Sequence, residues 1–357
     1  MKEHRFRQVD VRFSKKYLEN RWNDHILDCP AEVNSFVSDI YKEKEEVYAI
    51  IGMDSALHPR YMTVYTKEQL LEEREHPDRI VKTAVLNNVV NVCAAHIMDE
   101  DFLTVQRFGV ECFMKWHEED TYSWLNKVFG TFLIKLTDIV QVYPDGIANE
   151  FRSYIHSLDI RHEYTSMVFP KNTSDHSAEM LPKDIGIELY TLPGTSREVR
   201  TPEEAITYLG EKLSGLPREA VYIVNLGKDY VPESYVNLSL GRIGDAPIDM
   251  RCVYQTALLT GAEAVMIIHN HPSGNIDPSD SDFTMTRTVS KCGTMLGIPL
   301  FDSVIVSSGF RAGSKFRSIR AYAPTLFDTE ISTGYRNCID SYESGSAFSQ
   351  VAELSVD

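Results

Sequence analysis

The chain of 357 residues is 43% hydrophobic and 25% charged, so it can bury a sizeable core and is neither disordered nor membrane-like in composition. Its formal net charge of −16 argues against direct nucleic-acid binding, because an acidic surface repels phosphates unless basic residues gather on one face. The N-terminal stretch MKEHRFRQVDVRF lacks the apolar segment of a signal peptide, and no apolar run approaches the ~20 residues of a membrane-spanning helix.

Six cysteines are scattered singly along the chain, and none forms a C-x-x-C pair: Cys29, Cys93, Cys112, Cys252, Cys292 and Cys338. This usage is typical of reduced thiols and predicts neither a disulfide framework nor a cysteine-based zinc site. Together with the missing signal peptide, it leads us to expect a cytoplasmic protein that does not associate with membranes.

Residues 1–165 are predicted to form a mostly helical domain. Apolar residues recur near helical spacing in DRIVKTAVLNNVVNVCAAHIM, from Asp78, and in TYSWLNKVFGTFLIKLTDIVQVY, from Thr121. Thr66 is a suitable N-cap for the helix TKEQLLEEREHP, which stops before Pro77. We find no internal repeat and no family resemblance in this half. We expect it to position a substrate or to bind a protein partner.

The rest of the chain divides into a linker, an α/β domain and a tail. Residues 166–185 are rich in Pro, Ser, Asn and Asp and lack periodicity, which is typical of a linker. Residues 186–324 alternate strand and helix signals, which predicts helices packed on a mixed sheet. The predicted strands are 187–192, 220–226, 264–268 and 298–306, with a further strand from Tyr235, and the predicted helices are 201–215, 249–261 and 279–296. Residues 325–357 lack periodicity and are expected to be a flexible tail.

The stretch IIHNHPSGNIDPSDSD, residues 267–282, contains histidines and an aspartate at a spacing that suits metal binding. His269 and His271 follow the apolar run AVMII, and side chains at i and i+2 of an extended chain point to the same face. Asp282, placed about one turn into the next helix, can reach back toward them. Two imidazoles and one carboxylate leave a fourth tetrahedral position open, which is typical of a catalytic zinc site rather than a structural one.

A structural interpretation of the same residues is also open. A histidine at the end of a strand is usually a surface residue, and Ser279 with Asp282 forms the S-x-x-D pattern of an ordinary helix cap. The coincidence of all these features directly after a buried strand favours the metal site.

The pattern H-x-H-P-x6-S-x2-D, together with AVMIIHNHPSGN and GIPLFDSVIV, resembles the JAMM/MPN (JAB) metallopeptidases, and within them the RadC branch. The resemblance runs from about Glu198 to Tyr322 and implies a JAB/MPN-type mixed sheet with flanking helices. It implies that zinc (Zn²⁺) is held by His269, His271 and Asp282, and that Ser279 donates a hydrogen bond to the developing oxyanion.

The family also uses a glutamate at the start of an earlier strand. In PREAVYIVNL, Glu219 directly precedes the apolar run and matches this position, so the resemblance implies that Glu219 is the general base. Glu233, in VPESYV, is the competing candidate, and we expect it to be exposed in a hairpin turn. The chain departs from the RadC pattern at Ser303, where a histidine usually follows the aspartate that Asp302 matches.

Three functions remain open from the sequence. The first is a zinc metallopeptidase or isopeptidase that acts on a protein or peptide substrate. The second is a DNA-repair-associated accessory protein, as the RadC name implies. The third is a metal-binding interaction scaffold with little turnover. The full set of metal ligands and Glu219 favours the first.

Overall fold

The computed structural model describes residues 5–19, 22–43, 45–98, 114–142, 151–153, 185–240, 248–312, 314 and 316–327. They belong to two units, which we call the C-terminal unit (Met1–Arg12 and Leu189–Asp357) and the N-terminal unit (Phe13–Glu188). The predicted linker lies outside the described residues apart from residue 185, and the predicted tail lies outside them from residue 328 onward.

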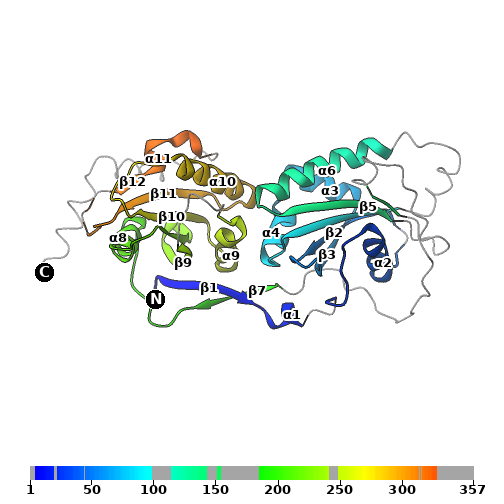
Figure 1. Cartoon of the computed structure of the whole chain (residues 1–357), viewed down its shortest axis with the longest axis horizontal. Coiled ribbons are helices and arrows are strands. Elements are labelled where there is room, and N and C mark those ends of the chain that lie inside the picture. The colour runs from blue at the N-terminus through cyan, green and yellow to red at the C-terminus, as the bar shows by residue number, and fades with distance from the viewer. Residues whose placement is uncertain are drawn as a thin grey trace. The chain divides into compact units, whose positions relative to one another are not determined.

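The C-terminal unit is built on a mixed sheet with the strand order β12-β11-β10-β8-β9-β1-β7 (Figure 1). Strand β10 pairs in parallel with β11 and antiparallel with β8, and β9 pairs antiparallel with β8 and in parallel with β1. The strands are β1 (Arg7–Phe13), β7 (Ile187–Thr191), β8 (Ala220–Leu226), β9 (Pro232–Leu240), β10 (Ala264–His271), β11 (Leu300–Ser307) and β12 (Phe316–Ser318).

The helices of this unit begin and end at residues with the expected capping chemistry. The Thr201 side chain accepts from the backbone N–H of Glu204 at the start of α8, and Gly261 and Gly297 end α9 and α10 in the left-handed conformation. The helical elements are α8 (Pro202–Leu213), η1 (Lys228–Tyr230), α9 (Met250–Thr260), α10 (Asp280–Leu296), α11 (Ile319–Tyr322) and η2 (Pro324–Leu326). The α/β prediction for this region is confirmed.

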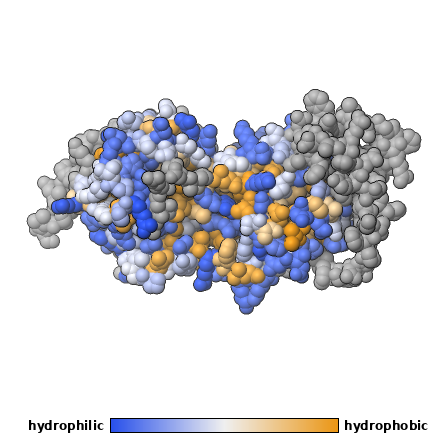
Figure 2. All heavy atoms as spheres, viewed as in Figure 1, coloured by the Kyte–Doolittle hydropathy of each residue, from blue (hydrophilic) through white to orange (hydrophobic). Residues whose placement is uncertain are grey.

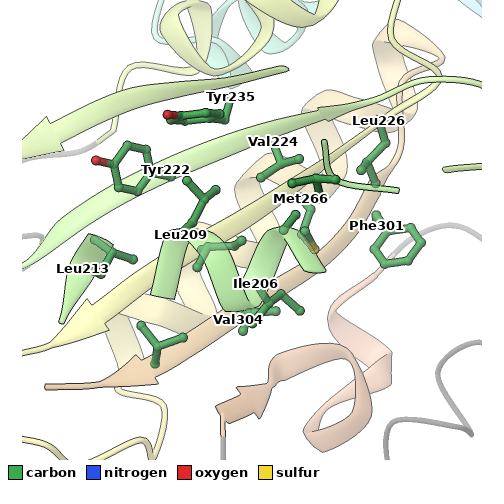
Figure 3. Close-up of a cluster of buried hydrophobic side chains, with 14 of the residues drawn as sticks. Ile206, Leu209, Leu213, Tyr222, Val224, Leu226, Tyr235, Met266, Phe301 and Val304 are labelled. Atoms are coloured by element: carbon green, nitrogen blue, oxygen red, sulfur yellow. The ribbon is translucent and has the colours of Figure 1, made fainter. Parts of the chain in front are cut away.

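Helix α8 packs on β8, β10 and β11 and closes one face of the sheet (Figure 3). Its Ile206 and Leu209 lie in one buried cluster with Val224 and Met266. Phe6 is also completely buried in this cluster, with its ring 4.9 Å from that of Tyr235. The first residues of the chain are therefore part of the C-terminal unit and not of the domain 1–165 in which the sequence placed them.

Helices α9 and α10 contact each other, and they pack on β8, β9 and β11. The side chain of Asn225, in β8, lies 3.4 Å from the Thr256 hydroxyl of α9, so the odd-numbered residues of β8 face these helices. The register between β8 and β10 places His269 opposite Val221, on the same face. The first histidine of the motif therefore points toward the layer that contains α10.

The N-terminal unit contains a second sheet, with the strand order β3-β2-β4-β5-β6. The strands are β2 (Val47–Met53), β3 (Pro59–Tyr65), β4 (Asn91–Ile97), β5 (Lys135–Val142) and β6 (Phe151–Ser153). The helices are α1 (Lys15–Leu18), α2 (Pro30–Ile40), α3 (Lys67–Glu75), α4 (Asp78–Leu86) and α6 (Met114–Thr131). The prediction of a mostly helical N-terminal half is therefore wrong.

This prediction failed because two sequence patterns that look like single helices are each a helix followed by a strand. In each pattern a residue in the left-handed conformation separates the two elements. The pattern from Asp78 runs through α4 into β4, and the chain turns at Asn88, with φ of 51°. The pattern from Thr121 runs through α6 into β5, and the chain turns at Leu133, with φ of 58°. Because β4 and β5 are almost fully buried, their apolar residues do not alternate with polar ones and cannot be told from a helix by periodicity.

Hydrophilic residues cover much of the coloured part of the face drawn in Figure 2. Large hydrophobic side chains are exposed at scattered positions of the sequence: Phe13, Leu18, Ile26, Leu71, Leu133, Ile185, Tyr190 and Tyr322. No helix in the described ranges is both long and apolar enough to cross a bilayer.

Candidate metal centre

The two histidines of the motif stand at the end of β10, a strand that is buried along nearly its whole length. Every residue of β10 up to Asn270 is buried, because β10 lies between β8 and β11 and is covered on both faces. The side chain of His269 is 0% exposed and that of His271 is 12% exposed. Their ring centroids lie 5.3 Å apart, as the alternation of side chains along a strand requires.

Asp282 reaches these histidines from the first turn of α10. Its Oδ1 lies 3.0 Å from His269 Nε2, and its Oδ2 lies 3.3 Å from His271 Nε2. One ligand atom from each of the three residues lies within 4.8 Å of the other two. The structure thus brings together the three residues that the sequence singled out as metal ligands.

The helix cap and the metal-ligand interpretation of Asp282 are compatible. The Ser279 N–H donates to Asp282 Oδ2 at 2.7 Å, and the Asp282 N–H donates to Ser279 Oγ at 3.3 Å, which completes a capping box. These bonds hold Asp282 through one carboxylate oxygen and leave Oδ1 directed toward His269. The cap therefore fixes the orientation of the carboxylate that the histidines face.

The electrostatics of the three residues are coupled. Burial raises the pKa of Asp282, but the facing imidazoles of His269 and His271 outweigh it and hold this pKa well below its usual range. Asp282 in turn raises the pKa of His271, against the effect of burial, and the negative charge of Glu219 adds to the increase. The carboxylate is therefore ionised across the physiological range, as a metal ligand must be.

Two observations show that the residues fit a zinc ion. Both ring nitrogens of His269 are buried. Nε2 faces the Asp282 carboxylate at 3.0 Å, and Nδ1 has no hydrogen-bond partner among the described residues, which is costly unless another group satisfies it. His271 Nδ1 lies 2.9 Å from the carbonyl oxygen of Asn275, so Nδ1 carries the hydrogen and neutral His271 presents the Nε2 lone pair to the centre. Two imidazole nitrogens and a carboxylate oxygen are a ligand set that zinc takes.

Glu219 lies beside the same end of β10. The antiparallel register pairs His269 with Val221, and its continuation by two residues places Glu219 opposite His271. Glu219 is half-buried, and its charge contributes to the raised pKa of His271. The candidate general base is therefore next to the three candidate ligands.

Glu233 lies at the opposite end of the sheet. It is the second residue of β9, where the register pairs Pro232 with Leu226, the far end of β8 from Glu219. Its half-buried side chain packs over Gly227, where an added Cβ would meet Glu233 Oε1 at 2.1 Å. The expectation that Glu233 is exposed in a hairpin turn is wrong, because the turn ends before β9 begins and the side chain folds back over it.

Asn270, between the two histidines, was not identified from the sequence. Its side chain is completely buried and spans to the neighbouring chain segment: Oδ1 accepts from the Ala220 N–H at 2.8 Å, and Nδ2 donates to the Arg218 carbonyl at 3.2 Å. These bonds hold the backbone on both sides of Glu219. The only signal in the sequence is a polar residue at a position that a buried strand would otherwise fill with an apolar one.

Ser279 and Ser303, the other two residues marked by the motif, differ in their surroundings. Ser279 is exposed, and its hydroxyl lies 2.7 Å from Asp282 Oδ2. Ser303 is completely buried in β11 opposite Ile267, on the face that carries His269, and its hydroxyl has no hydrogen-bond partner among the described residues. Ser303, where the chain departs from the family pattern, therefore lies on the same face of the sheet as His269. It is not one of the three candidate ligands, so the candidate ligand set is unchanged.

A family model described as a RadC-like JAB domain matches residues 199–319, so this part of the chain is a RadC-like JAB domain. A UPF0758 protein of Clostridium acetobutylicum is 29% identical over 114 residues, which are 32% of this chain and 50% of that protein. A UPF0758 protein of Salinibacter ruber is 33% identical over 122 residues, 34% of this chain and 50% of that protein. The chain thus spans about half the length of the curated relatives it matches, and the matched part lies in its C-terminal half.

The coupled pKa values of Asp282 and His271 predict a stability maximum in chelated, metal-free protein. The lowered pKa of Asp282 gives stability that is present above its unfolded value of about 4 and is lost as the pH falls further. The raised pKa of His271 gives stability that is full below its unfolded value of about 6.5 and is lost as the pH rises through the folded value. We expect Asp282→Asn to flatten this maximum in thermal unfolding with EDTA across pH 3–9.

The matched control is Asp280→Asn, since Asp280 is an exposed acid in the same helical turn and does not face the histidines. This variant should keep the maximum. An unchanged pH profile in Asp282→Asn would contradict the coupling.

Proposed function

We propose that the chain is a zinc-dependent metallohydrolase that cleaves an amide bond, either a peptide or an isopeptide bond. The observation that carries the proposal is the convergence of His269, His271 and Asp282 at the end of β10, with Glu219 beside them on the neighbouring strand. The match of residues 199–319 to a RadC-like JAB domain supports it. The substrate would be a protein or peptide, which the N-terminal unit would help to position or to recruit through a partner.

His269, His271 and Asp282 would hold the zinc and leave its fourth position for substrate and water. Bound zinc would lower the pKa of water toward ~7 and polarise the carbonyl group of the substrate. The ligands are pre-oriented, since the capping box fixes Asp282 and the Asn275 carbonyl fixes the tautomer of His271. Arranging these ligands when the metal binds would therefore cost little free energy.

Glu219 would act as general base and then as general acid. Its carboxylate takes a proton from the attacking water as the C–O bond forms, and it returns this proton to the amine nitrogen as the C–N bond breaks. The half-buried position at the edge of the site suits this role, because it lets the carboxylate reach both substrate and solvent. Glu219 is not one of the metal-ligand candidates, so its removal would separate catalysis from metal binding.

Ser279 would donate a hydrogen bond to the oxyanion that develops from the carbonyl oxygen. Its hydroxyl is exposed at the mouth of the site, and the hydrogen that now faces Asp282 Oδ2 can be redirected by rotation about the Cβ–Oγ bond. The backbone N–H of Ser279 keeps Asp282 in place during this rotation, because it holds the same oxygen independently.

We expect about one zinc per chain, bound through the three candidate ligands. The double variant His269→Ala, His271→Ala should lose most of this metal and keep its fold, since the AVMII part of β10 holds the strand in the sheet. Metal analysis of the purified protein, together with circular dichroism, checks both expectations. Asp277→Asn is the control, because Asp277 is an exposed acid of the same loop that pairs with Arg317 at 3.2 Å. Full zinc occupancy in the double variant would exclude this site.

We expect Glu219→Gln to keep zinc and fold but to lose hydrolysis by about 10²–10⁴-fold, the usual contribution of a general base. Glu233→Gln is the matched control at the other end of β8 and should stay near wild type. Peptide libraries incubated with each purified variant, with products identified by mass spectrometry, provide the readout. The assignment fails if Glu233→Gln is the inactive variant and Glu219→Gln turns over normally.

Asn270 would position Glu219 without touching the substrate. Asn270→Ala removes both hydrogen bonds around Glu219 and should lower kcat by up to about 10²-fold, with zinc content retained, because small displacements of a catalytic group are costly. In a double-mutant cycle, Asn270→Ala should add little to Glu219→Gln. Asn225→Ala is the control, since Asn225 is an equally buried asparagine that bonds Ser234 at 3.0 Å away from the site. Additive losses would mean that Asn270 does not act through Glu219.

A further inference from the structure

We propose that the N-terminal unit is a second copy of the JAB-type fold, and that a histidine–glutamate pair occupies the place of its metal site. The first observation is the topology of the two sheets. Strands β2, β3, β4, β5 and β6 have the same order as β8, β9, β10, β11 and β12, and the same four pairings, three antiparallel and one parallel. The helices that precede and connect them follow in the same sequence, with α2 for α8, α4 for α9 and α6 for α10, and α3 is an additional helix of the N-terminal unit.

The irregularities of the two sheets coincide as well. The parallel pair β10–β11 has a register shift between Val265 and Met266, and the parallel pair β4–β5 has one between Val92 and Cys93. A bulge is a local feature that a shared topology does not require. Its presence at the same place in both sheets indicates a common origin rather than two solutions to the same packing problem.

The residue that follows each bulge is a buried aspartate in the same role. Asp302 pairs with Met266, and its Oδ1 accepts from the Ser303 N–H at 2.6 Å. Asp138 pairs with Cys93, and its Oδ1 accepts from the Ile139 N–H at 2.8 Å. Both carboxylates therefore accept from the backbone N–H of the residue that follows them, directly beside the bulge.

The hairpins and helix ends also correspond. Pro59 begins β3 and Pro232 begins β9, each after a register shift in the preceding strand, and each is preceded by a left-handed residue, Leu57 or Tyr230. The left-handed residues that end the connecting helices match too: Asn88 for Gly261 and Leu133 for Gly297. The tripeptide Phe-Arg-Ser forms both β6 and β12 and pairs with its neighbour in the same register.

This correspondence places a second histidine and a second glutamate at the equivalent site. The third residue after Met266 is His269, and the third residue after Cys93 is His96. Glu219 directly precedes β8, and Glu46 directly precedes β2. His96 therefore holds the place of the first ligand, and Glu46 holds the place of the general base.

The remaining positions of the site have changed. Met98 stands where the second ligand, His271, stands in the JAB domain, and Ile97 stands where Asn270 bonds the backbone around Glu219. Among the described residues, the set in the C-terminal unit is the one group of His, Cys, Asp and Glu close enough to hold a metal. The counterpart site thus keeps two of the residue types and lacks the second imidazole.

The two retained residues bind each other. His96 Nε2 lies 2.8 Å from Glu46 Oε1, and the His96 side chain is only 7% exposed. The Tyr48 ring stacks on the imidazole, with centroids 4.1 Å apart and planes 11° apart. His96 holds the pKa of Glu46 below its usual range. The pair therefore stabilises the sheet. Without a second imidazole, the described residues of the N-terminal unit lack the ligand set of a catalytic zinc site.

The test uses the full chain and the variants His96→Ala, Glu46→Gln and their combination. After zinc loading and desalting, His96→Ala should keep the wild-type metal content, while its unfolding temperature falls by several degrees. The effects of the two single substitutions on the unfolding temperature should be strongly non-additive, because each removes the same pair. His58→Ala is the control, since His58 is a partly exposed histidine of the same unit, 3.5 Å from Asp54. Should His96→Ala not fold, His96→Gln keeps an N–H donor for Glu46 and carries the metal measurement.

Loss of one metal equivalent in a His96 variant would overturn the inference, and so would additive effects of the Glu46 and His96 substitutions. The inference rests on the proposed function only for the position of the zinc site. Different experimental outcomes would contradict the inference and the proposed function. Metal that persists in His269→Ala, His271→Ala and does not depend on His96 contradicts the proposed site alone. If the wild-type chain binds no metal, the proposed function fails, and the coupling between Glu46 and His96 still decides the inference.

Discussion

The burial of β10 between β8 and β11 is the constraint on which both the fold and the candidate site of the C-terminal unit depend. Hydrogen bonds to a parallel and an antiparallel neighbour fix the register of β10, and the cores on both faces fix which side chains point to which helix. A slip by one residue would turn His269 and His271 toward the other face and bury polar groups against α8. The same register sets Glu219 opposite His271. Packing therefore determines the geometry of the site before any metal binds.

The site combines structural and chemical roles in the same atoms. Asp282 caps α10 and faces both histidines, so the helix that covers the sheet also supplies the carboxylate of the candidate site. Against this, His269 leaves its buried Nδ1 without a hydrogen bond among the described residues, which destabilises the metal-free fold. An unfavourable contribution to the free energy of folding at one position, within an otherwise consistent fold, is typical of a functional site. The placement of a fully buried imidazole against this carboxylate supports the proposed metal site.

The sequence was sufficient to predict that His269, His271 and Asp282 lie together and that an α/β fold surrounds them, because both predictions rest on local signals. Capping residues such as Ser279 and Gly297 and the apolar run before His269 are short-range patterns. The sheet of the N-terminal unit could not be predicted in this way. Its strands are buried and apolar throughout, and the turn at Leu133 has no glycine to mark it. The role of Asn270 could not be predicted either, since it depends on a hydrogen bond to Ala220, in a strand far away in the sequence. In each case the missing information is a long-range contact.

If the N-terminal unit is a second copy of the fold, the two copies separate residues that the fold requires from residues that the chemistry requires. Asp302 belongs to the motif that resembles the family, yet Asp138 bonds the backbone of its own bulge in the same way without a neighbouring metal motif. The Ser318 hydroxyl and the Arg320 N–H also donate to Asp302, and burial raises its pKa to about 6. These contacts are those of a structural carboxylate. Ser303, by contrast, is a buried hydroxyl on the face of His269 where the other copy has Ile139. The aspartate of this stretch is therefore a structural residue that bonds the backbone beside the bulge between β10 and β11.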